Sequence, residues 1–373
     1  MHCDLLVLGG GVIGLACARA IHDRHPGLRV AILDADTGAL PASRAAAGML
    51  APFAEFAEDS PLARFCTESL ARYRGGWLDR LTKESGVAVE CLWNGTLVPA
   101  FLGEDARFDA KCRDIAERGL AHRILEGPAL RAAEPALAPA IERALWLPEG
   151  VLNPRQLHDA LREAGRRRGF VFLEDRATEV IADGARVAGL RLAGGGEVGC
   201  ERLLAATGAW GEAVARLLDV RFPVGPVKGQ VGRIAAPDGL LRHIIHLKAL
   251  YLAPRPGQGV VLGATEEPGA GFDTTVAPRV MADFHADAAR LVPALADCPL
   301  AEAWAGFRPR TPDAAPLLGP IARWSNVLVA TGHFRNGILL TPLTGEVLAG
   351  LYDGEAAWEE FAAERFVGVG GRS

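Results

Sequence analysis

The feature that most constrains this chain is a glycine motif that directly follows a short apolar run near its start. Residues 4–8 read D-L-L-V-L, and Gly9-x-Gly11-x-x-Gly14 then opens an apolar segment that reaches residue 21. A second apolar run follows and ends on Asp34, 20 residues after Gly14. The pattern predicts strand, buried helix and strand, which together form a βαβ unit. A glycine motif in this context is typical of a dinucleotide-binding fold.

Each residue of the motif has a physical role in such a fold. Gly9 permits a tight turn, Gly11 lets the backbone approach a pyrophosphate, and Gly14 lets the helix pack against the strand. Asp34 can accept hydrogen bonds from the ribose hydroxyls. These residues predict nucleotide binding, but alone they do not separate FAD from NAD.

Composition limits the classes of protein that remain. A chain of 373 residues that is 50% hydrophobic and 23% charged can form two domains around a large core. Its formal charge of −5 argues against a nucleic-acid partner, and the run Arg166–Arg168 is expected to end a helix. The seven cysteines have no metal-ligand spacing, so we expect reduced thiols and no metal site. With no signal peptide or long apolar span, the sequence predicts a soluble cytoplasmic protein without a membrane partner.

The periodicity changes along the chain. Helical patterns cover residues 59–86, 105–119 and 154–168, and short strand-like runs cover 171–174, 177–182, 186–192, 197–200 and 202–206. Between residues 224 and 307 the runs alternate, which predicts an antiparallel sheet with one helix near 278–291. A buried strand at 326–331 and a helix at 338–352 then return to the first architecture.

Three further segments favour FAD over a nicotinamide. Residues 43–50, S-R-A-A-A-G-M-L, predict a second helix start at which Ser43 caps, next to Arg44, and free N–H groups meet phosphate or flavin. Residues 206–210, A-T-G-A-W, end a strand at Gly208, beside the expected pyrophosphate. Residues 330–337 repeat this strand-to-helix pattern near the C-terminus. An ordinary capped helix is the alternative for the first segment.

Several longer motifs resemble those of the glycine oxidases, within the wider D-amino-acid oxidase and sarcosine oxidase family. They are S-R-A-A-A-G-M-L-A-P (43–52), G-P-V-K-G-Q (225–230), G-A-T-E-E (263–267) with G-F-D (271–273), W-A-G-F-R-P-R-T-P-D (304–313) and G-H-F-R-N-G-I-L-L-T-P (332–342). The similarity spans nearly the whole chain, and the last two motifs are the most specific.

The resemblance implies a set of cofactor-binding and substrate-binding residues. The residues that it places around FAD are Val12, Ile13, Asp34, Ser43, Ala47, Gly48, Met49, Val180 through its backbone, His333, Phe334, Arg335, Asn336, Gly337, Ile338 and Leu339. It assigns Arg308 to the substrate carboxylate, with Tyr251 and Arg335 beside it. The family commonly has Glu at the ribose position, where this chain has the similar residue Asp34.

The residues themselves agree with part of this assignment. Arg308 follows Gly306-Phe307 and can form a bidentate pair with a carboxylate, although a solvated loop arginine is the alternative. The helix at 338–352 would direct its positive end toward a reduced flavin, unless it merely begins at a domain joint. Tyr251 could equally be a plain sheet residue, and the pair Glu266-Glu267 reads as a strand end more readily than as an acid/base dyad. No cysteine lies in the last two motifs, so FAD is expected to bind non-covalently.

The predicted fold class is α/β: a two-domain FAD flavoprotein with a Rossmann-like FAD-binding domain and an antiparallel-sheet substrate domain. The FAD-binding domain is expected to be discontinuous, comprising residues 1–85, 145–222 and 310–373, and the substrate domain to comprise 86–144 and 223–309. Its sheet would cover the flavin.

The resemblance implies oxidative deamination of glycine, with sarcosine and small D-amino acids as lesser substrates. A neutral amine would lose a hydride to the flavin, and dioxygen would then accept the electrons and form hydrogen peroxide. It also implies formation of the thiamin thiazole and a homotetramer. The rivals are a D-amino-acid dehydrogenase that reduces a quinone, a sarcosine oxidase-like enzyme and a nucleotide-binding subunit without turnover.

Overall fold

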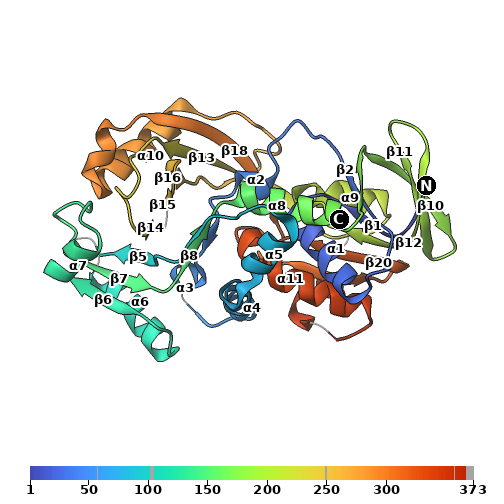
Figure 1. The fold of residues 1–373 in the computed structure, drawn as a ribbon, viewed down its shortest axis with the longest axis horizontal. Helices are drawn as coiled ribbons and strands as arrows, with labels where there is room; N and C mark the ends of the chain where they lie inside the picture. The colour runs from blue at the N-terminus through green and yellow to red at the C-terminus, as the bar shows by residue number, and fades with distance from the viewer. Residues whose placement is uncertain (57, 101–104, 248–249, 357, 367–373) are drawn as a thin grey trace, which may run out of the picture.

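Two large sheets lie side by side in the computed structural model, with helices packed along the first of them (Figure 1). The structure describes residues 1–56, 58–100, 105–247, 250–356 and 358–366. The predicted domain segments also contain positions that lie outside the described residues, namely 57, 101–104, 248–249, 357 and 367–373.

The first sheet has a parallel centre, as the βαβ pattern predicts. Its central strands, in spatial order, are β20 (Trp324–Thr331), β12 (Glu197–Ala205), β1 (His2–Leu8), β2 (Val30–Asp34) and β9 (Val171–Glu174). The antiparallel strands β19 (Leu317–Ile321), β10 (Ala177–Asp183) and β11 (Arg186–Leu192) extend it. β12 is one continuous strand where the sequence suggested two runs, and it borders β11 with its first half and β20 with its second.

Both faces of this sheet are covered at its centre, which explains why the central strands β1 and β2 are mostly apolar. Leu5 and Val7 of β1 pack in the same core as helix α1 (Val12–Arg24), together with α8 (Pro154–Arg167) and α11 (Gly337–Tyr352). Leu6 and Leu8 pack in a separate core with the β10–β11 hairpin and α9 (Gly211–Leu217). Each face of the sheet therefore has its own hydrophobic core.

The second sheet is mostly antiparallel. Its strands are β17 (Glu267–Pro268), β13 (Gly225–Ile234), β16 (Gly259–Gly263), β15 (Tyr251–Arg255), β14 (Ile244–His246), β5 (Thr96–Pro99), β7 (Arg143–Leu147) and β6 (Arg123–Glu126), with β18 (Leu300–Arg310) on the free side of β13. One pair, β14 with β5, is parallel, which corrects the expectation of a purely antiparallel sheet. The two strands come from distant segments of the chain, so no hairpin fixes their relative direction.

A small three-stranded sheet connects the two regions and consists of β3 (Met49–Leu50), β8 (Gly150–Leu152) and β4 (Cys91–Leu92). The remaining helices are α2 (Ala42–Ala45), α3 (Pro52–Glu55), α4 (Pro61–Arg72), α5 (Leu78–Ser85), α6 (Asp105–Glu117), α7 (Gly127–Ala133) and α10 (Pro278–Leu291), with short helical turns η1 (Tyr73–Trp77), η2 (Gly208–Trp210), η3 (Pro293–Asp297), η4 (Glu359–Phe361) and η5 (Ala363–Phe366).

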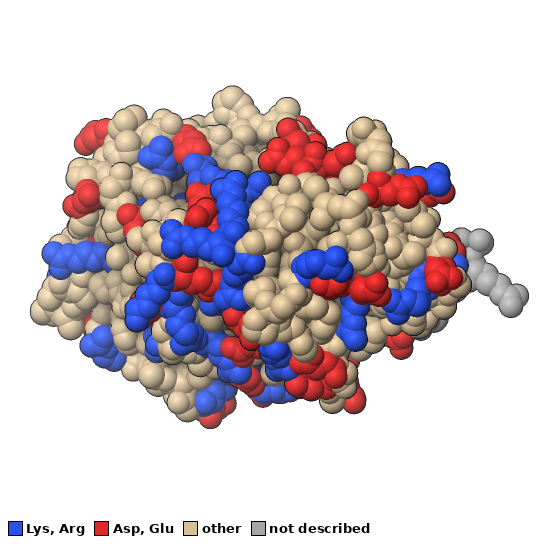
Figure 2. Space-filling model, turned by 45° about the vertical axis from the view of Figure 1, so that its right-hand side comes forward, with Lys and Arg blue, Asp and Glu red and all other residues tan. Residues whose placement is uncertain are grey.

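Helix ends follow the local chemistry of the sequence. The Asn153 side chain caps α8 by accepting from the N–H groups of Arg155 and Gln156, and the basic run at its other end lies where the helix dipole favours cations. Within the described part of the chain, no helix combines the length and apolarity needed to cross a bilayer. Charges of both signs are interspersed on the face drawn in Figure 2.

Candidate functional site

The turn between β1 and α1 is tight, and its first residue has no room for a side chain. Gly9 has φ +102°, and a Cβ there would come within 2.4 Å of the Ala206 carbonyl oxygen. A Cβ on Gly14 would lie 2.1 Å from the Gly9 carbonyl oxygen, so α1 approaches the turn closely. A Cβ on Gly11 would instead meet only the Ser43 hydroxyl within contact distance. The backbone at the start of α1 is therefore open to a ligand.

Ser43 contributes to this turn in a way that differs from the expectation. The Val12 N–H donates to Ser43 Oγ at 3.0 Å, which satisfies one of the free N–H groups at the start of α1. Ser43 does not cap its own helix, because α2 begins at Ala42 and Pro41 occupies the cap position. The predicted local cap is therefore wrong, and the hydroxyl instead links two helix starts.

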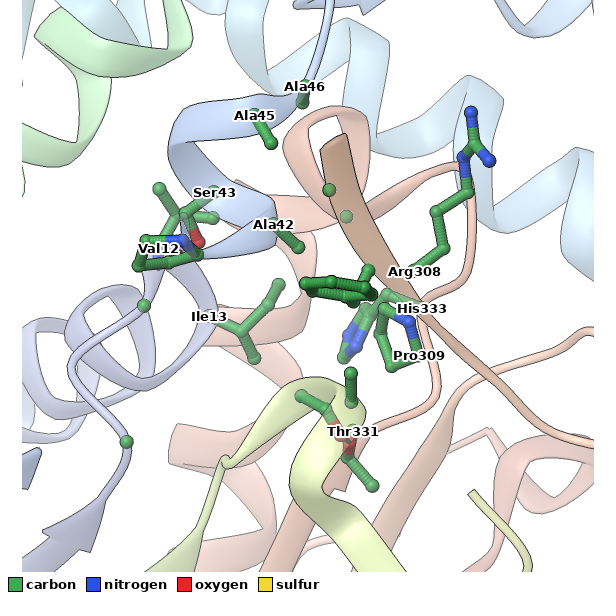
Figure 3. Close-up of a pocket in the computed structure, with 18 of the residues that line it drawn as sticks. Val12, Ile13, Ala42, Ser43, Ala45, Ala46, Arg308, Pro309, Thr331 and His333 are labelled. Carbon is green, nitrogen blue, oxygen red and sulfur yellow. Dashed lines mark hydrogen bonds between the residues drawn. The ribbon is translucent and has the colours of Figure 1, made fainter. Parts of the chain in front are cut away.

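A cavity of about 750 Å³ extends from this turn to the second sheet, which is the size of a cofactor and substrate site. In Figure 3, Val12, Ile13 and Ser43 lie on one side of it, and Arg308, Pro309 and His333 lie on the other. The lining also includes Asp34 at the end of β2 and Tyr251 at the start of β15.

Most residues that the sequence predicted for the site line this one cavity. They are Gly9, Gly11, Val12, Ile13, Asp34, Ser43, Ala47, Gly48, Met49, Gly208, Tyr251, Arg308, His333, Phe334, Arg335, Asn336, Gly337 and Ile338. These residues come from both sheets and from segments at both ends of the chain.

Four predicted residues do not line it. Gly14 packs under the turn, and Arg44 forms an ion pair with Asp159 at 2.5 Å. Val180 packs against the core formed with the β10–β11 hairpin, and Leu339 is buried, with its carbonyl accepting from Ser69 Oγ.

Other lining residues were not predicted from the sequence. Asp175 to Thr178 follow β9, whose carboxyl end lies beside that of β2, so the rule that ligands bind at carboxyl ends of parallel strands could have found them. His158 Nε2 donates to the Gly10 carbonyl oxygen, 2.8 Å away. Glu55 and His246 carry no sequence signal, because each lies at the end of a short element that only the tertiary fold brings to the cavity.

Arg308 is half-buried, and its guanidinium has no ionic partner among the described residues. Its Nη1 donates to the Thr265 carbonyl at 2.9 Å, and the other groups that face it electrostatically are Tyr251, Arg335, Glu266 and Glu55. Burial lowers the pKa of Arg308, although the group stays charged at neutral pH. An anion that enters the cavity would gain a strong partner there.

Arg335 is in a different position. Its guanidinium forms an ion pair with Glu266, which also pairs with Arg310 at 3.2 Å. The Arg335 side chain is 45% exposed, whereas Arg308 is half-buried. We infer that Arg335 lies at the rim of the cavity, where Glu266 already compensates its charge.

In the lining, His333 is buried and Tyr251 is half-buried. Burial raises the pKa of the Tyr251 hydroxyl, opposed by the nearby Arg308 and Arg255. Burial lowers the pKa of His333 to about 3, so its ring is neutral, and Nε2 lies 3.1 Å from Thr344 Oγ1 within α11. His333 therefore supports the start of α11 and carries no charge into the cavity.

The residues present fit a flavin dinucleotide. The backbone at Gly11 is open on the side that lines the cavity, the N-terminus of α1 suits a pyrophosphate, and Asp34 stands at the end of β2 where a ribose would lie. At the opposite end, α11 begins at Gly337 with Ile338 in the lining, so a positive helix terminus meets the cavity near Arg308 and Tyr251.

Comparison with known proteins agrees with this geometry. A family model described as DAO, FAD dependent oxidoreductase, matches residues 4–351. The bifunctional protein ThiO/ThiG of Nostoc sp. is 34% identical over 357 residues, covering 94% of this chain and 53% of that protein. Hydrogen cyanide synthase subunit HcnC of Pseudomonas aeruginosa is 32% identical over 387 residues, covering 92% of this chain and 91% of that one.

The likeness extends to three dimensions. The crystal structure of glycine oxidase from Geobacillus kaustophilus matches with a TM-score of 0.89 at 31% identity, covering 98% of this chain and 99% of that chain. The chain spans about half the length of the bifunctional relatives that it matches.

Proposed function

Because the chain belongs to the DAO family of FAD-dependent oxidoreductases, we propose that it catalyses the oxidative deamination of glycine, and less readily of sarcosine and small D-amino acids. It is an enzyme that binds FAD and oxidises amines. The choice of glycine is supported by the motifs it shares with glycine oxidases and by the structural match to the enzyme of that name.

The observation that carries the proposal is the half-buried guanidinium of Arg308, which lines the cavity and has no ionic partner among the described residues. A substrate as small as glycine offers little except a carboxylate and an amine, so its orientation must come from these groups. Arg308 can hold the carboxylate in a bidentate pair, and Tyr251 presents a hydroxyl to the same part of the cavity. Holding the carboxylate in this way fixes the position of the substrate's α-carbon, and the reaction requires that this carbon be held in one place.

Other parts of the chain form the surroundings in which the reaction takes place. Bound FAD supplies the acceptor for the α-carbon hydride, and the dioxygen that reoxidises it becomes hydrogen peroxide. The start of α11 places partial positive charge at the cavity wall, which stabilises negative charge that develops there. The proposed FAD-binding domain is the first sheet with its helices, and the second sheet carries Arg308 and Tyr251.

We also propose that the product enters formation of the thiamin thiazole, which the similarity to the ThiO/ThiG protein supports. We further propose a homotetramer, which light scattering of the purified protein would test.

The decisive experiment is anaerobic mixing of the purified yellow protein with glycine, sarcosine and D-alanine. We expect glycine to bleach the flavin with the highest kcat/KM, and air to restore the colour with one peroxide formed per turnover. Bleaching without peroxide in air, together with reduction of a quinone, would favour a dehydrogenase. A flavin that no amine bleaches would contradict the proposed function.

A further inference from the structure

Glu55 is a carboxylate that faces the cavity and lacks an ion pair among the described residues. It ends the short helix α3, and the Asn336 side chain hydrogen-bonds to it. Two other carboxylates line the same cavity, but at its nucleotide end: Asp34 is the last residue of β2, and Asp175 follows the adjacent strand β9. Glu55 is therefore the carboxylate of the lining that lies near Arg308 and Arg335.

Glu55 and Arg308 carry opposite charges, and neither forms an ion pair with a described residue. Each lies in electrostatic reach of the other, yet no ion pair joins them. Arg335, the other cation near Glu55, already pairs with Glu266. A ligand with a carboxylate at one end and a cation at the other would compensate both Arg308 and Glu55, and an amino-acid zwitterion has this form.

We propose that Glu55 binds the ammonium group of the substrate zwitterion and accepts one of its protons, so that the substrate becomes a neutral amine before its α-carbon is oxidised. This inference rests on the proposed function and assigns to Glu55 a catalytic contact with the substrate. In the step an N–H bond breaks, an O–H bond forms on a Glu55 carboxylate oxygen, and the electron pair stays on nitrogen. The total charge is conserved, and no oxidant or reductant takes part.

The surroundings of Glu55 suit a proton acceptor. The titratable groups that face it are Arg335, Arg308, Glu266 and, from α4, Cys66. Burial raises the pKa of Glu55, with Arg335 and the Asn336 hydrogen bond opposing that rise. A carboxylate with a raised pKa accepts a proton more readily than an exposed one, and it does so from its ionised form.

The pH dependence has a definite sign. Only ionised Glu55 can take the proton, so kcat/KM for glycine falls as pH falls through the raised pKa of Glu55. In Glu55→Gln the limb set by Glu55 is replaced by one set by the ammonium group of free glycine, which lies at higher pH. The variant should recover at alkaline pH, where free glycine has already lost its ammonium proton in solution.

The test compares holoenzymes of the wild type, Glu55→Gln, Glu55→Asp, Arg308→Ala and the control Glu68→Gln. Glu68 gives the same change of charge on the exposed side of α4, where it pairs with Arg72 at 3.5 Å. Two ligands are used: glycine, followed by the rate of anaerobic flavin bleaching from pH 6 to 10, and acetate, followed by calorimetric titration. Acetate has the carboxylate but no amine.

We expect Glu55→Gln to lower the bleaching rate with glycine at least about tenfold at pH 7, which corresponds to one charge-assisted hydrogen bond. The difference in bleaching rate between the wild type and Glu55→Gln should shrink steadily toward pH 10. Glu55→Asp should recover part of the rate at pH 7. Acetate should bind Glu55→Gln as tightly as the wild type or more tightly, because a repulsive charge is gone. Arg308→Ala should lose affinity for both ligands, and Glu68→Gln should match the wild type.

Two results would overturn the inference separately from the proposed function. One is wild-type bleaching by glycine with an unchanged pH profile in Glu55→Gln. The other is a loss of acetate affinity in Glu55→Gln as large as its loss of rate with glycine, which would indicate a general distortion of the cavity. If no amino acid bleaches the wild-type flavin, the proposed function fails and this inference fails with it.

Discussion

The guanidinium of Arg308 lies directly over Gly229, so that a Cβ on residue 229 would come within 2.4 Å of Nη1 and 2.7 Å of Cζ. Gly229 belongs to β13, which pairs with β18, the strand that carries Arg308. The absence of a side chain at residue 229 therefore provides the space in which the guanidinium rests.

Gly229→Ala should displace the Arg308 guanidinium, because the end of a flexible side chain moves more easily than the strand does. We expect kcat/KM for glycine to fall at least about fivefold, which corresponds to roughly 1 kcal/mol, with little change in the melting temperature. Gly225→Ala on the same strand is the matched control, since a Cβ there meets no atom within 4 Å. Equal losses in the two variants would show that the strand, and not the guanidinium, is disturbed.

Arg308→Ala should lower kcat/KM for glycine by at least about tenfold, since losing a charge-assisted contact costs about 1.5 to 3 kcal/mol. Arg308→Lys should recover only part of the loss, because one ammonium cannot reproduce the planar fork. Amines without a carboxylate should lose far less, and FAD content should stay near normal. Wild-type kinetics in Arg308→Ala with full flavin would mean that another residue, such as Arg335, holds the carboxylate.

Asp34→Ala should weaken FAD binding and leave the preference among substrates almost unchanged. The missing acceptor leaves ribose hydroxyls unpaired, at a cost of about 1 to 3 kcal/mol. Titration of the apoprotein with FAD measures this loss. Unaltered affinity would assign the ribose to another residue, for which Asp175 is a candidate because it follows the neighbouring strand β9 and lines the same cavity.

FAD should be released by acid precipitation. All seven cysteines are described, and none lines the cavity, so none is placed to form a thioether with the flavin. We expect a colourless pellet and free FAD in the supernatant, identified by chromatography. Colour that stays in the pellet would show a covalent link, and recovery of a nicotinamide would show the wrong cofactor.

The parts of the fold that the sequence predicted are those set by local pattern. The β1–α1–β2 unit, α10 at Pro278–Leu291 and the return through β20 to α11 follow from short apolar runs and their spacing. The parallel pairing of β14 with β5 could not be predicted, because it joins segments far apart in the chain with no turn between them. Nor could the runs at 197–200 and 202–206 be recognised as parts of one strand, β12.

In the site, too, residues within local motifs could be predicted, whereas residues placed there only by the tertiary fold could not. Glycine positions, Asp34 and Arg308 belong to motifs, and the structure brings them to one cavity. Ser43 was recognised but given the wrong partner, because the Val12 N–H that it accepts from belongs to a helix 31 residues earlier. Glu55 and His246 lie in no motif, and their relevance depends on which residues the tertiary fold places opposite them.

The wall of the cavity that α11 forms has a consequence for biosynthesis. Helix α11 packs on α1, where Cys17 donates to the Thr344 carbonyl across 327 residues, and on α4, where Ser69 reaches Leu339 across 270 residues. The β1–α1 turn is therefore synthesised long before α11, the helix that completes its surroundings. This wall of the cavity can form only once α11 has been synthesised, so the nucleotide turn lacks it while the residues between α1 and α11 are translated.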